Sequence, residues 1–326
     1  MNVSIRETPL QIVSTGLVVP PTVESAADLA PRLGRSKEWI EGRTGVLERR
    51  VAHESMAEMA AAAVREAVGD GPRPDLLINA SLTPMQLAPD SSVFVLRTLG
   101  WHGTPGFSLH ATCLSFLDAL PVVAGLLDTR AFQRVVVVSA ERGSVCRDFG
   151  EPESAALIGD GAAAAVFTTA PTGGPALLGH AMGTWPDGAD LAGIEGFGER
   201  HPPYAADTSD THHRFHMRGP AVYRFTRSKV SDLLDALIGK LGLNVADIDL
   251  VVPHQASGPA LASLDRLGFP AEKVVNIVGW AGNCIAASLP MAIAVAVRDG
   301  RLAPGRTVLM LGTGAGVSVS AAVLRW

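Results

Sequence analysis

Most of the chain alternates between short, largely apolar runs and segments whose apolar residues recur at helical spacing. The runs Leu76–Leu82 (LLINASL) and Arg134–Ala140 (RVVVVSA) predict buried strands, because a strand covered on both faces shows little polar alternation. Glu54–Val68 and Pro220–Leu241 have apolar residues three and four positions apart, which predicts helices. Strands and helices follow one another in both halves of the chain, so the pattern predicts an α/β fold.

A Gly- and Pro-rich segment, Ala170–Pro175 (APTGGP), divides the chain near its middle. The order of strands and helices before it resembles the order after it, so we expect residues 1–173 and 174–326 to form two related halves. Trp185–Arg218 interrupts the second half with an insertion rich in Gly, His and Asp. Its histidines are more typical of a solvated variable loop than of a metal site, because no ligand pair sits in a strand-and-turn frame.

Three further segments have less regular patterns. Trp39–Arg50 (WIEGRTGVLERR) is interpreted as a polar loop, and its tryptophan and arginines suit a surface that binds a phosphate and stacks on a ring. Taken alone, the stretch is explained better as an ordinary solvated loop. Val274–Val278 is predicted to be a strand, and Gly316–Leu324 an edge strand or the arm of a hairpin.

The most informative change of pattern lies in Gly106–Leu120 (GFSLHATCLSFLDAL). Apolar residues alternate up to Ala111, which predicts a strand, and from Leu114 onward they take helical spacing. Cys113 therefore falls at a strand-to-helix turn, where the free N–H groups of a helix start favour an anion. Such a position lowers the pKa of a thiol and favours the nucleophilic thiolate. On this stretch alone, a small apolar residue of the core is an equally good interpretation.

Two later junctions supply partners for this cysteine. Leu250–Ser257 (LVVPHQAS) places His254 directly after an apolar strand, and Gly279–Ser288 (GWAGNCIAAS) places Asn283 before a helix of small residues. Reactive groups of α/β sheets gather at the carboxyl ends of strands. A thiol, an imidazole and an amide at three such junctions form a set suited to nucleophilic catalysis with oxyanion stabilisation.

The glycine-rich segment Leu311–Gly316 (LGTGAG) adds a turn whose backbone N–H groups are able to face a developing oxyanion. It is not a dinucleotide fingerprint, because no helix follows it. Each feature also has a simpler explanation: His254 as a buried core histidine, Asn283 as a helix cap, the glycines as a plain turn. Their occurrence together, in this order, favours the catalytic interpretation.

Composition narrows the class of protein. The chain has 27 Lys and Arg against 32 Asp and Glu, a net charge of −5, and no long basic run, which argues against nucleic acid as a partner. Its three cysteines are spaced too widely for a disulfide framework or a metal site. No apolar segment is long enough to span a membrane, and the first residues lack the core of a signal peptide. We therefore expect a cytoplasmic enzyme with no membrane partner.

Motifs over almost the whole chain, apart from the insertion, resemble the 3-oxoacyl-acyl-carrier-protein synthase III family of the thiolase superfamily. They are KEWIEGRTGVLERRVA (37–52), ATCLSF (111–116), GDGAAAAV (159–166), PHQAS (253–257), EKVVNIVGWAGNCIAAS (272–288) and RDGRLAPGRTVLMLGTGAG (298–316). The resemblance implies the five-layered αβαβα thiolase fold with two pseudo-symmetric halves, and a homodimer. It also implies acyl-CoA and acyl carrier protein as partners, and no metal or redox cofactor.

The resemblance assigns roles to individual residues. Cys113 takes an acyl group from acyl-CoA as a thioester. His254 and Asn283 hold a malonyl thioester while it loses carbon dioxide, and they stabilise the enolate that attacks the acyl-cysteine. The backbone N–H groups of Cys113 and Ala315 would form the other oxyanion hole.

Other positions that the resemblance assigns concern substrates. Trp39 and Arg43 match the residues that stack on and grip the CoA nucleotide. Ala88 and Thr313 stand where short-chain members of the family have bulky aromatic residues, so we expect a deeper acyl pocket and medium or longer acyl chains. Pro259 replaces a basic position used to dock the carrier protein, which leaves that docking open.

Three functions are compatible with these residues. The first is a decarboxylating condensation that gives a 3-oxoacyl product in fatty-acid or secondary metabolism. The second transfers the acyl group to an oxygen or nitrogen nucleophile, with His254 as general base and no loss of carbon dioxide, and forms an ester or amide. The third is a non-catalytic dimer partner, which the retention of Cys113, His254 and Asn283 argues against. Release of carbon dioxide separates the first function from the second, and acylation of Cys113 separates both from the third.

Overall fold

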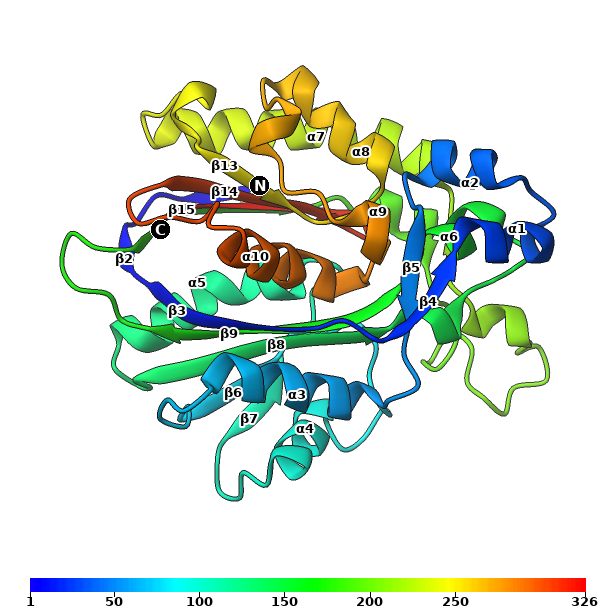
Figure 1. Ribbon diagram of the computed structural model, residues 1–326, viewed down its shortest axis with the longest axis horizontal. Helices are drawn as coiled ribbons and strands as arrows, with labels where there is room; N and C mark the ends of the chain where they lie inside the picture. Colours follow the sequence, from blue (N-terminus) through cyan, green and yellow to red (C-terminus); the bar gives the residue numbers. More distant parts are fainter.

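A computed structural model describes every residue from Met1 to Trp326, and two stacked mixed β-sheets form its centre (Figure 1). The first sheet has the strand order β3-β9-β8-β6-β7. Its strands are β3 (Gln11–Val18), β6 (Leu76–Asn79), β7 (Gly106–Ser108), β8 (Arg134–Arg142) and β9 (Asp160–Thr168). Strands β8, β6 and β7 run parallel, whereas β3 and β8 pair with β9 in antiparallel fashion.

The second sheet has six strands in the order β1-β10-β15-β14-β13, with β2 paired to β10. Its strands are β1 (Asn2–Ser4), β2 (Thr8–Pro9), β10 (Ala176–Thr184), β13 (Leu250–Pro253), β14 (Thr307–Gly314) and β15 (Ser318–Arg325). All strands of the first sheet thus precede the Gly- and Pro-rich segment, and four of the second sheet follow it. Strands β1 and β2 are the exception, because the N-terminus crosses to the second sheet before β3 enters the first.

Helices cover the sheets in three layers (Figure 1). Helices α5 (Ser115–Asp128) and α10 (Ser288–Arg298) lie between the two sheets; α3 (Met56–Val68) and α4 (Ser91–Leu99) cover the outer side of the first sheet. Helices α7 (Gly219–Lys240) and α8 (Gly258–Ala262) cover the outer side of the second sheet. The largest buried cluster, 37 residues, lies between the sheets and includes Phe116 and Leu120 of α5 and Met291 of α10. The predicted five-layered αβαβα architecture is confirmed.

The remaining elements gather mainly at one end of the sandwich (Figure 1). They are α1 (Ala26–Leu33), α2 (Lys37–Thr44), α6 (Pro152–Leu157), α9 (Val278–Ala281), β4 (Thr22–Ser25), β5 (Glu48–Val51), β11 (Ala192–Gly193) and β12 (His216–Met217). Short 3₁₀ helices are η1 (Gly143–Cys146), η2 (Pro186–Leu191), η3 (Asp210–His213), η4 (Val245–Asp247), η5 (Ser263–Leu267), η6 (Ala271–Lys273) and η7 (Ile285–Ala287).

The polar loop predicted at Trp39–Arg50 is wrong, because its first half is helix α2 and its end is strand β5. The Ser36 side chain caps the helix by accepting the N–H of Trp39 at 3.1 Å. Gly45 ends the helix in the left-handed conformation, with φ +77°. These caps lie at the two ends of a segment with few apolar residues, so hydrophobic spacing gives no sign of the helix.

Two predictions about strands also need correction. Val274–Val278 forms no strand beyond one bridge between Val274 and Val251, and α9 begins at its last residue. Gly316–Leu324 is the arm of a hairpin, as one of the two alternatives predicted, but β15 lies between β10 and β14 instead of at an edge. Its alternation therefore reflects two different packed faces instead of one face exposed to water.

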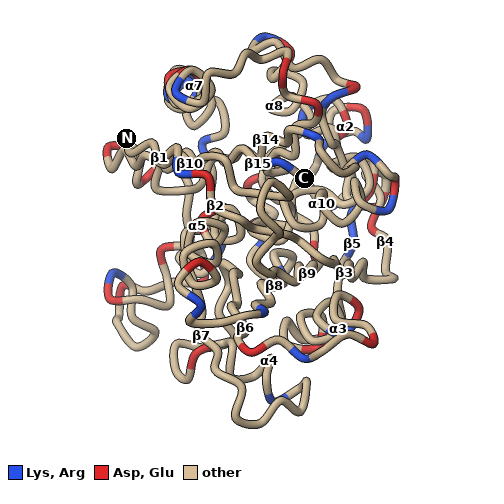
Figure 2. Tube along the Cα trace, turned by 90° about the vertical axis from the view of Figure 1, so that its left-hand side faces the viewer, with Lys and Arg blue, Asp and Glu red and all other residues tan.

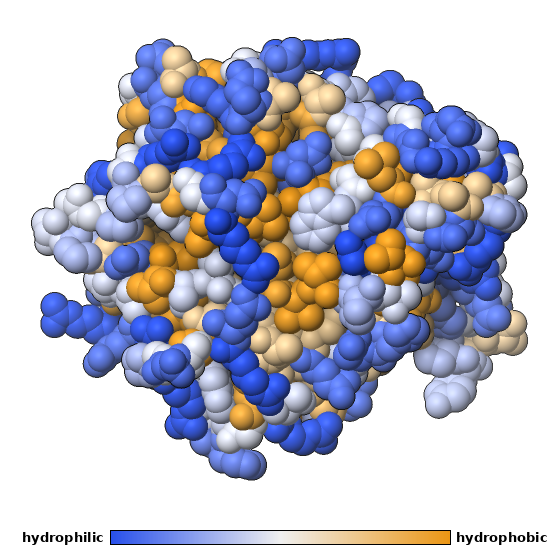
Figure 3. All heavy atoms as spheres, viewed as in Figure 1, coloured by the Kyte–Doolittle hydropathy of each residue, from blue (hydrophilic) through white to orange (hydrophobic).

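Charged residues lie mostly on the outer helices and loops (Figure 2). In the space-filling view, apolar groups also reach the surface near the middle of one face, framed by hydrophilic ones (Figure 3). Such partial exposure of apolar groups is ordinary for a folded chain. None of the helices is both long enough and apolar enough to cross a bilayer.

Candidate active site

Cys113 lies two residues before the first residue of α5, at the junction that the sequence predicts. Leu114 is the N-cap residue of the helix, and no side chain forms a capping hydrogen bond there. The Ser115 hydroxyl instead donates to the carbonyl of Thr112 at 2.7 Å and accepts the N–H of Ala111 at 3.0 Å. Thr112 has φ +53°, in the left-handed region that non-glycine residues seldom adopt. The turn that carries Cys113 is therefore held by hydrogen bonds at both of its ends.

The expected lowering of the Cys113 pKa is not found. Burial raises the pKa of the Cys113 thiol to about 12, and the nearby Glu141 carboxylate adds to the rise. Hydrogen bonds from the N–H groups of Ala315 and of Cys113 itself act in the opposite direction and are outweighed. Desolvation thus exceeds the influence of the helix start, so the resting side chain is a thiol instead of a thiolate.

The glycine-rich turn after β14 meets the cysteine directly. The Thr112 hydroxyl donates to the Ala315 carbonyl oxygen at 3.4 Å, and the N–H of Ala315 acts to lower the pKa of the Cys113 thiol. Gly312 is needed for this approach, because a Cβ there would lie 2.7 Å from Leu114 Cδ2 and 3.1 Å from His254 Cβ. The glycine-rich turn thus lies close to the turn of Cys113 and to the backbone of His254, and it carries Ala315.

His254 follows β13 immediately, as predicted, and is buried. Its backbone N–H donates to the Leu311 carbonyl at 2.7 Å, which fixes the residue against β14. Burial lowers the pKa of the His254 imidazole to about 4, so the ring is neutral at pH 7. The Nδ1 atom is buried without a hydrogen-bond partner. No protein group therefore fixes the ring tautomer at Nδ1, and the ring is able to act as either acceptor or donor.

Asn283 has its amide held in one orientation. Its Oδ1 accepts the backbone N–H of Ile285 at 2.8 Å, and its Nδ2 donates to the Ala256 carbonyl at 3.3 Å. Because a backbone N–H only donates, the oxygen assignment is fixed. Asn283 thus does cap the following turn, which was its simpler explanation. One hydrogen of Nδ2 stays free of protein partners, and the bond to Ala256 ties Asn283 to the segment that carries His254.

The glycine before Asn283 shapes its turn. Gly282 has φ +68°, and a Cβ on it would lie 2.5 Å from the Leu157 carbonyl oxygen. The same carbonyl accepts the N–H of Asn283 at 2.8 Å, and the Asn283 carbonyl accepts the N–H of Gly159 at 3.1 Å. The strand-to-helix junction predicted at Asn283 is wrong, because Asn283 lies between α9 and η7; this turn is locked to the start of β9.

The two residues predicted to bind CoA lie on helix α2, away from the cysteine turn. Trp39 is half-buried, with the Arg35 guanidinium 5.2 Å from its ring centroid. Arg43 is exposed and forms an ion pair with Glu153 of α6 at 2.8 Å. Its guanidinium is thus already engaged, and a phosphate would have to compete with that carboxylate.

A cavity of about 340 Å³ opens beside His254. Most of its wall is apolar and comes from α7, α8, η5 and the end of β14, with Thr313 at that end; apolar lining residues include Val230, Leu261, Leu264, Leu267 and Leu311. Thr313, which the resemblance assigns to the acyl pocket, lines this cavity, whereas Cys113 is not among the lining residues. Ala88 does not line this cavity and lies on an exposed loop between β6 and α4.

Sequence reasoning did not find Glu141, a fully buried carboxylate near the end of β8. Burial raises the pKa of Glu141 to about 7, although hydrogen bonds oppose the rise. Its signal in the sequence is an acidic residue directly after the apolar run RVVVVSA, where a strand passes into the interior. Buried acids of this kind are rare without a partner or a task.

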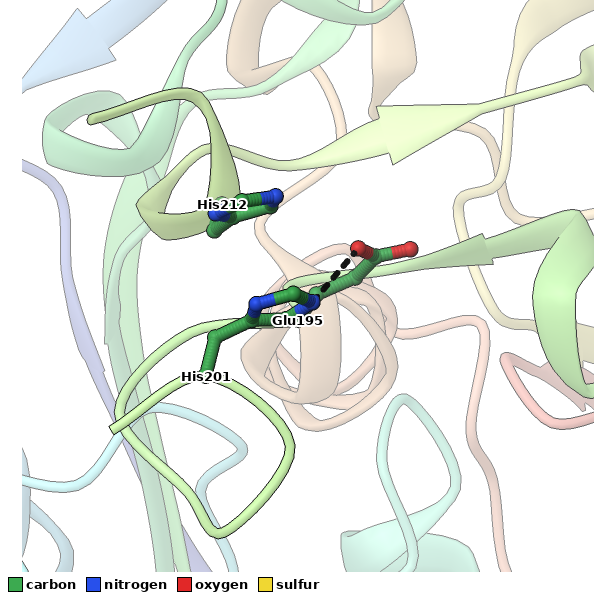
Figure 4. Close-up of side chains that lie close together, drawn as sticks. All are labelled: Glu195, His201 and His212. Atoms are coloured by element: carbon green, nitrogen blue, oxygen red, sulfur yellow. Dashed lines mark ion pairs between the residues drawn. The ribbon is translucent and has the colours of Figure 1, made fainter. Parts of the chain in front are cut away.

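Three side chains of the insertion lie close together (Figure 4). They are Glu195, His201 and His212, and each offers one atom able to ligate a metal within 4.8 Å of the others. The two histidine rings stack with centroids 3.8 Å apart and planes 10° apart. A ring nitrogen binds a metal in its ring plane, so two parallel rings do not point at one ion. Nδ1 of His212 also accepts the N–H of Ser209 at 3.0 Å, which places the ring proton on Nε2. The cluster is better explained as packing within the loop than as a metal site.

Comparisons with known proteins cover nearly the whole chain. Family profiles match at residues 107–186 (3-Oxoacyl-[acyl-carrier-protein (ACP)] synthase III) and 238–326 (its C terminal part). The Beta-ketoacyl-[acyl-carrier-protein] synthase III of Desulfitobacterium hafniense strain Y51 is 33% identical over 322 residues, 97% of either chain. That of Erythrobacter litoralis is 34% identical over 326 residues, 97% of this chain and 98% of its own. The crystal structure of the Pseudomonas aeruginosa PAO1 synthase III is 29% identical, covers 98% of both chains and has a TM-score of 0.88.

Fold and comparisons together define a condensing acyltransferase of the thiolase-like class. The sequence matches extend over both sheets and both ends of the chain, so they are not confined to one motif. The chain belongs to the 3-oxoacyl-acyl-carrier-protein synthase III family.

Proposed function

We propose that this enzyme loads a medium or longer acyl group from acyl-CoA onto Cys113 and condenses it with a malonyl thioester, with loss of carbon dioxide. The product is a 3-oxoacyl thioester for fatty-acid or secondary metabolism. The observation that carries the proposal is the contact of the cysteine turn with the glycine-rich turn, through the Thr112 hydroxyl and the Ala315 carbonyl, at the start of a buried helix. A neutral His254 and an Asn283 amide of fixed orientation supply the remaining groups.

In the loading step, the Cys113 sulfur attacks the thioester carbonyl of acyl-CoA. A bond forms between the sulfur and the acyl carbon, and the bond from that carbon to the CoA sulfur breaks. A thiol with a raised pKa needs a base for this attack, and His254 is neutral and so able to take the proton and pass it to the leaving CoA thiolate. The N–H groups of Cys113 and Ala315 stabilise the oxyanion, and one such donor typically contributes about 2.7–4 kcal/mol.

In the condensing step, His254 and the free N–H of Asn283 Nδ2 donate to the carbonyl oxygen of the malonyl thioester. The carbon–carbon bond to the malonyl carboxylate breaks, carbon dioxide leaves, and the two donors stabilise the enolate that remains. The enolate carbon attacks the acyl-cysteine carbonyl, and the Cys113 thiolate leaves and regains a proton. Support for both roles of His254 comes from its unpartnered Nδ1, because a ring that is free to change tautomer accepts in one step and donates in the other.

The acyl chain is proposed to extend past Thr313 into the apolar cavity beside His254. Each methylene buried there contributes about 0.8 kcal/mol, so a chain that reaches the leucine-lined wall gains over acetyl. Ala88 stays a candidate for the acyl pocket only where a second subunit covers its loop.

The proposal includes the substrates and assembly that the family resemblance implies. Trp39 stacks on the CoA nucleotide, and Arg43 exchanges Glu153 for its phosphates. Acyl carrier protein presents the malonyl group, and the enzyme acts as a cytoplasmic homodimer without a metal or redox cofactor. The names of its relatives, which are acyl-carrier-protein synthases, support the carrier protein as a partner.

Release of carbon dioxide tests the proposed reaction. The enzyme is incubated with octanoyl-CoA and carboxyl-labelled malonyl-CoA or malonyl carrier protein, and labelled carbon dioxide and thioester products are measured. We expect release in equal amounts with a 3-oxodecanoyl product, and only when octanoyl-CoA is present. If Cys113 becomes acylated and no malonyl thioester loses carbon dioxide, the condensation is wrong, and acyl transfer to an oxygen or nitrogen nucleophile takes its place.

A further inference from the structure

Asp160 is the acidic residue of the motif GDGAAAAV (159–166), and the reaction above gives it no role. It is the first residue of β9 and is fully buried. Its carboxylate accepts the backbone N–H of Ala52 at 2.8 Å, the backbone N–H of Ser144 at 2.8 Å and the Ser144 hydroxyl at 2.6 Å. Burial of a carboxylate is costly unless hydrogen-bond donors surround it, so these three bonds hold the carboxylate in one place.

The donors to Asp160 come from two segments that are distant in the sequence. Ala52 follows strand β5, and Ser144 lies in η1, which comes directly after β8. The carboxylate therefore fixes the start of β9 to both segments. The residues that precede Asp160 are fixed with it.

Those preceding residues bond to the backbone of Asn283. The N–H of Gly159 donates to the Asn283 carbonyl at 3.1 Å, and the N–H of Asn283 donates to the Leu157 carbonyl at 2.8 Å. The two segments are in close contact, because a Cβ on Gly159 would lie 2.2 Å from the Ala281 carbonyl oxygen. A shift at the start of β9 is therefore passed on to the backbone of Asn283.

Asp160 also acts on the residue that orients the Asn283 amide. The N–H of Ile285 donates to Asn283 Oδ1 at 2.8 Å. The Ile285 side chain lies over Gly143, the residue before Ser144, because a Cβ on Gly143 would lie 3.0 Å from Ile285 Cδ1. The bonds from Ser144 to the Asp160 carboxylate thus hold the surface against which Ile285 packs.

We propose that Asp160 is a positioning residue of the condensation, which holds the Asn283 amide where it donates to the enolate oxygen. It acts through the Asn283 backbone on one side and through the packing of Ile285 on the other. The kinetic consequence rests on the proposed function, whereas the structural consequence does not. A donor misplaced by about 1 Å costs roughly a hundredfold in rate, so a small shift of this turn is sufficient.

The test uses Asp160→Asn, which keeps the size of the side chain and leaves it only one oxygen. Its NH2 group then meets at least one of the donors that the carboxylate accepts. The first readout is amide hydrogen exchange of the substrate-free enzyme, followed by mass spectrometry. We expect peptides that contain Asn283 and Ile285 to exchange roughly tenfold faster than in the wild type. The cysteine turn at 111–115 is expected to exchange at the wild-type rate.

The second readout is kinetic. In Asp160→Asn, condensation of octanoyl-CoA with malonyl-CoA is expected to slow roughly tenfold to a hundredfold. Loading of Cys113 is expected to keep its wild-type rate, because the Asn283 amide acts only in the condensing step. In an Asn283→Ala background, Asp160→Asn should cause no further slowing, because the amide that Asp160 positions is gone.

Two further variants make the result specific. Asp75→Asn is the matched control, because Asp75 also accepts two backbone N–H groups, those of Gln133 and Arg134, at 2.8 Å each. It is expected to leave both readouts unchanged. Ser144→Ala removes one donor to Asp160 and serves if Asp160→Asn does not fold. It is expected to change both readouts in the same direction by a smaller factor.

The signature of the proposal is faster exchange at the Asn283 turn together with slower condensation and unchanged loading. Exchange at that turn equal to the wild type overturns the proposal. So does an equal slowing of loading and condensation, or the same changes in Asp75→Asn, because the effect would then come from loosened structure. Additive slowing in the Asn283→Ala background overturns action through that amide. If the wild type releases no carbon dioxide, the proposed function fails and the exchange readout still decides whether Asp160 positions the turn.

Discussion

At Cys113 two electrostatic influences on the thiol oppose each other, and their outcome depends on distance and burial that a sequence does not contain. The helix start and the N–H of Ala315 favour the thiolate, whereas burial and Glu141 disfavour it. The position of the cysteine is predictable from the change of hydrophobic period. The direction of its pKa shift is not, because the burial that decides it, and the smaller influence of Glu141, 28 residues further along the chain, arise only in the fold.

The donors for the enolate give the first prediction at this scale. His254→Ala and Asn283→Ala should each still load an acyl group onto Cys113, and each should lower condensation roughly 10²–10³-fold, the usual cost of one lost oxyanion donor. Both groups donate to the second carbonyl, where charge develops only in the condensing step; His254 is also the base of the loading step, so His254→Ala should load more slowly than Asn283→Ala. Loading is followed by intact mass and condensation by carbon dioxide release, with the exposed His53→Ala as control. Condensation at the wild-type rate in either variant removes that residue from the mechanism.

At the scale of elements, strong hydrophobic periodicity predicts helices and strands well, but it does not reveal short helices that are defined by their caps. Helices α3 and α7 and strand β8 begin and end within two residues of the predicted segments 54–68, 220–241 and 134–140. Helix α2 was missed because Ser36 and Gly45 define it instead of apolar spacing. The turns that carry Cys113, His254 and Asn283 were found because each follows a recognisable change of pattern. Their meeting depends on contacts such as Gly312 with Leu114, which link distant segments.

The end of β14 carries the prediction for chain length. Thr313→Phe should fill the mouth of the apolar cavity and reverse a preference for octanoyl over acetyl. In the wild type, two methylenes in contact with the wall favour the longer chain by roughly tenfold. Equal amounts of acetyl-CoA and octanoyl-CoA compete for Cys113, and the masses on the protein are compared. Ala88→Phe, on the exposed loop outside the cavity, is the paired variant.

The pair of variants separates two locations for the chain. Loss of octanoyl loading in Thr313→Phe alone places the chain in the cavity beside His254. The same loss in Ala88→Phe alone places it under the loop after β6. A wild-type enzyme that prefers acetyl contradicts the assignment of medium or longer chains altogether.

For the whole molecule, the buried imidazole of His254 links stability to pH. Its pKa is about 4 in the folded chain against 6.5 as the ordinary value, so between these values the unfolded chain binds more protons. The buried His254 therefore has almost no effect on the free energy of unfolding above pH 6.5. The free energy of unfolding decreases as the pH falls from 6.5 toward 4. On going from pH 7 to pH 5, the wild type should lose about 2 kcal/mol relative to His254→Asn. Urea unfolding of both proteins at the two pH values measures this, and parallel changes in both would contradict a neutral buried ring.

Assembly is the second property at this scale. Strand β7 is an edge strand of the first sheet, and its Phe107 is 40% exposed; Leu87, in the loop between β6 and α4, is 77% exposed. An uncovered edge with apolar side chains favours pairing with another chain. We expect a homodimer in analytical ultracentrifugation, and Phe107→Lys should shift it toward monomer. Val23→Lys, at a similarly exposed apolar position on β4, is the control. A Phe107→Lys protein that stays as dimeric as the control contradicts the use of this edge.

The account stands on Cys113 as the carrier of the acyl group, and intact mass spectrometry measures this most directly. Wild-type enzyme is incubated with octanoyl-CoA, its mass is read, and the modified residue is mapped before and after addition of a malonyl thioester. We predict one octanoyl group on Cys113 that disappears when the malonyl thioester is added, and none on Cys113→Ser, because its hydroxyl lacks the nucleophilicity of the sulfur. An octanoyl group on Cys113→Ser, or one mapped to Cys146 or Cys284 in the wild type, would contradict the account.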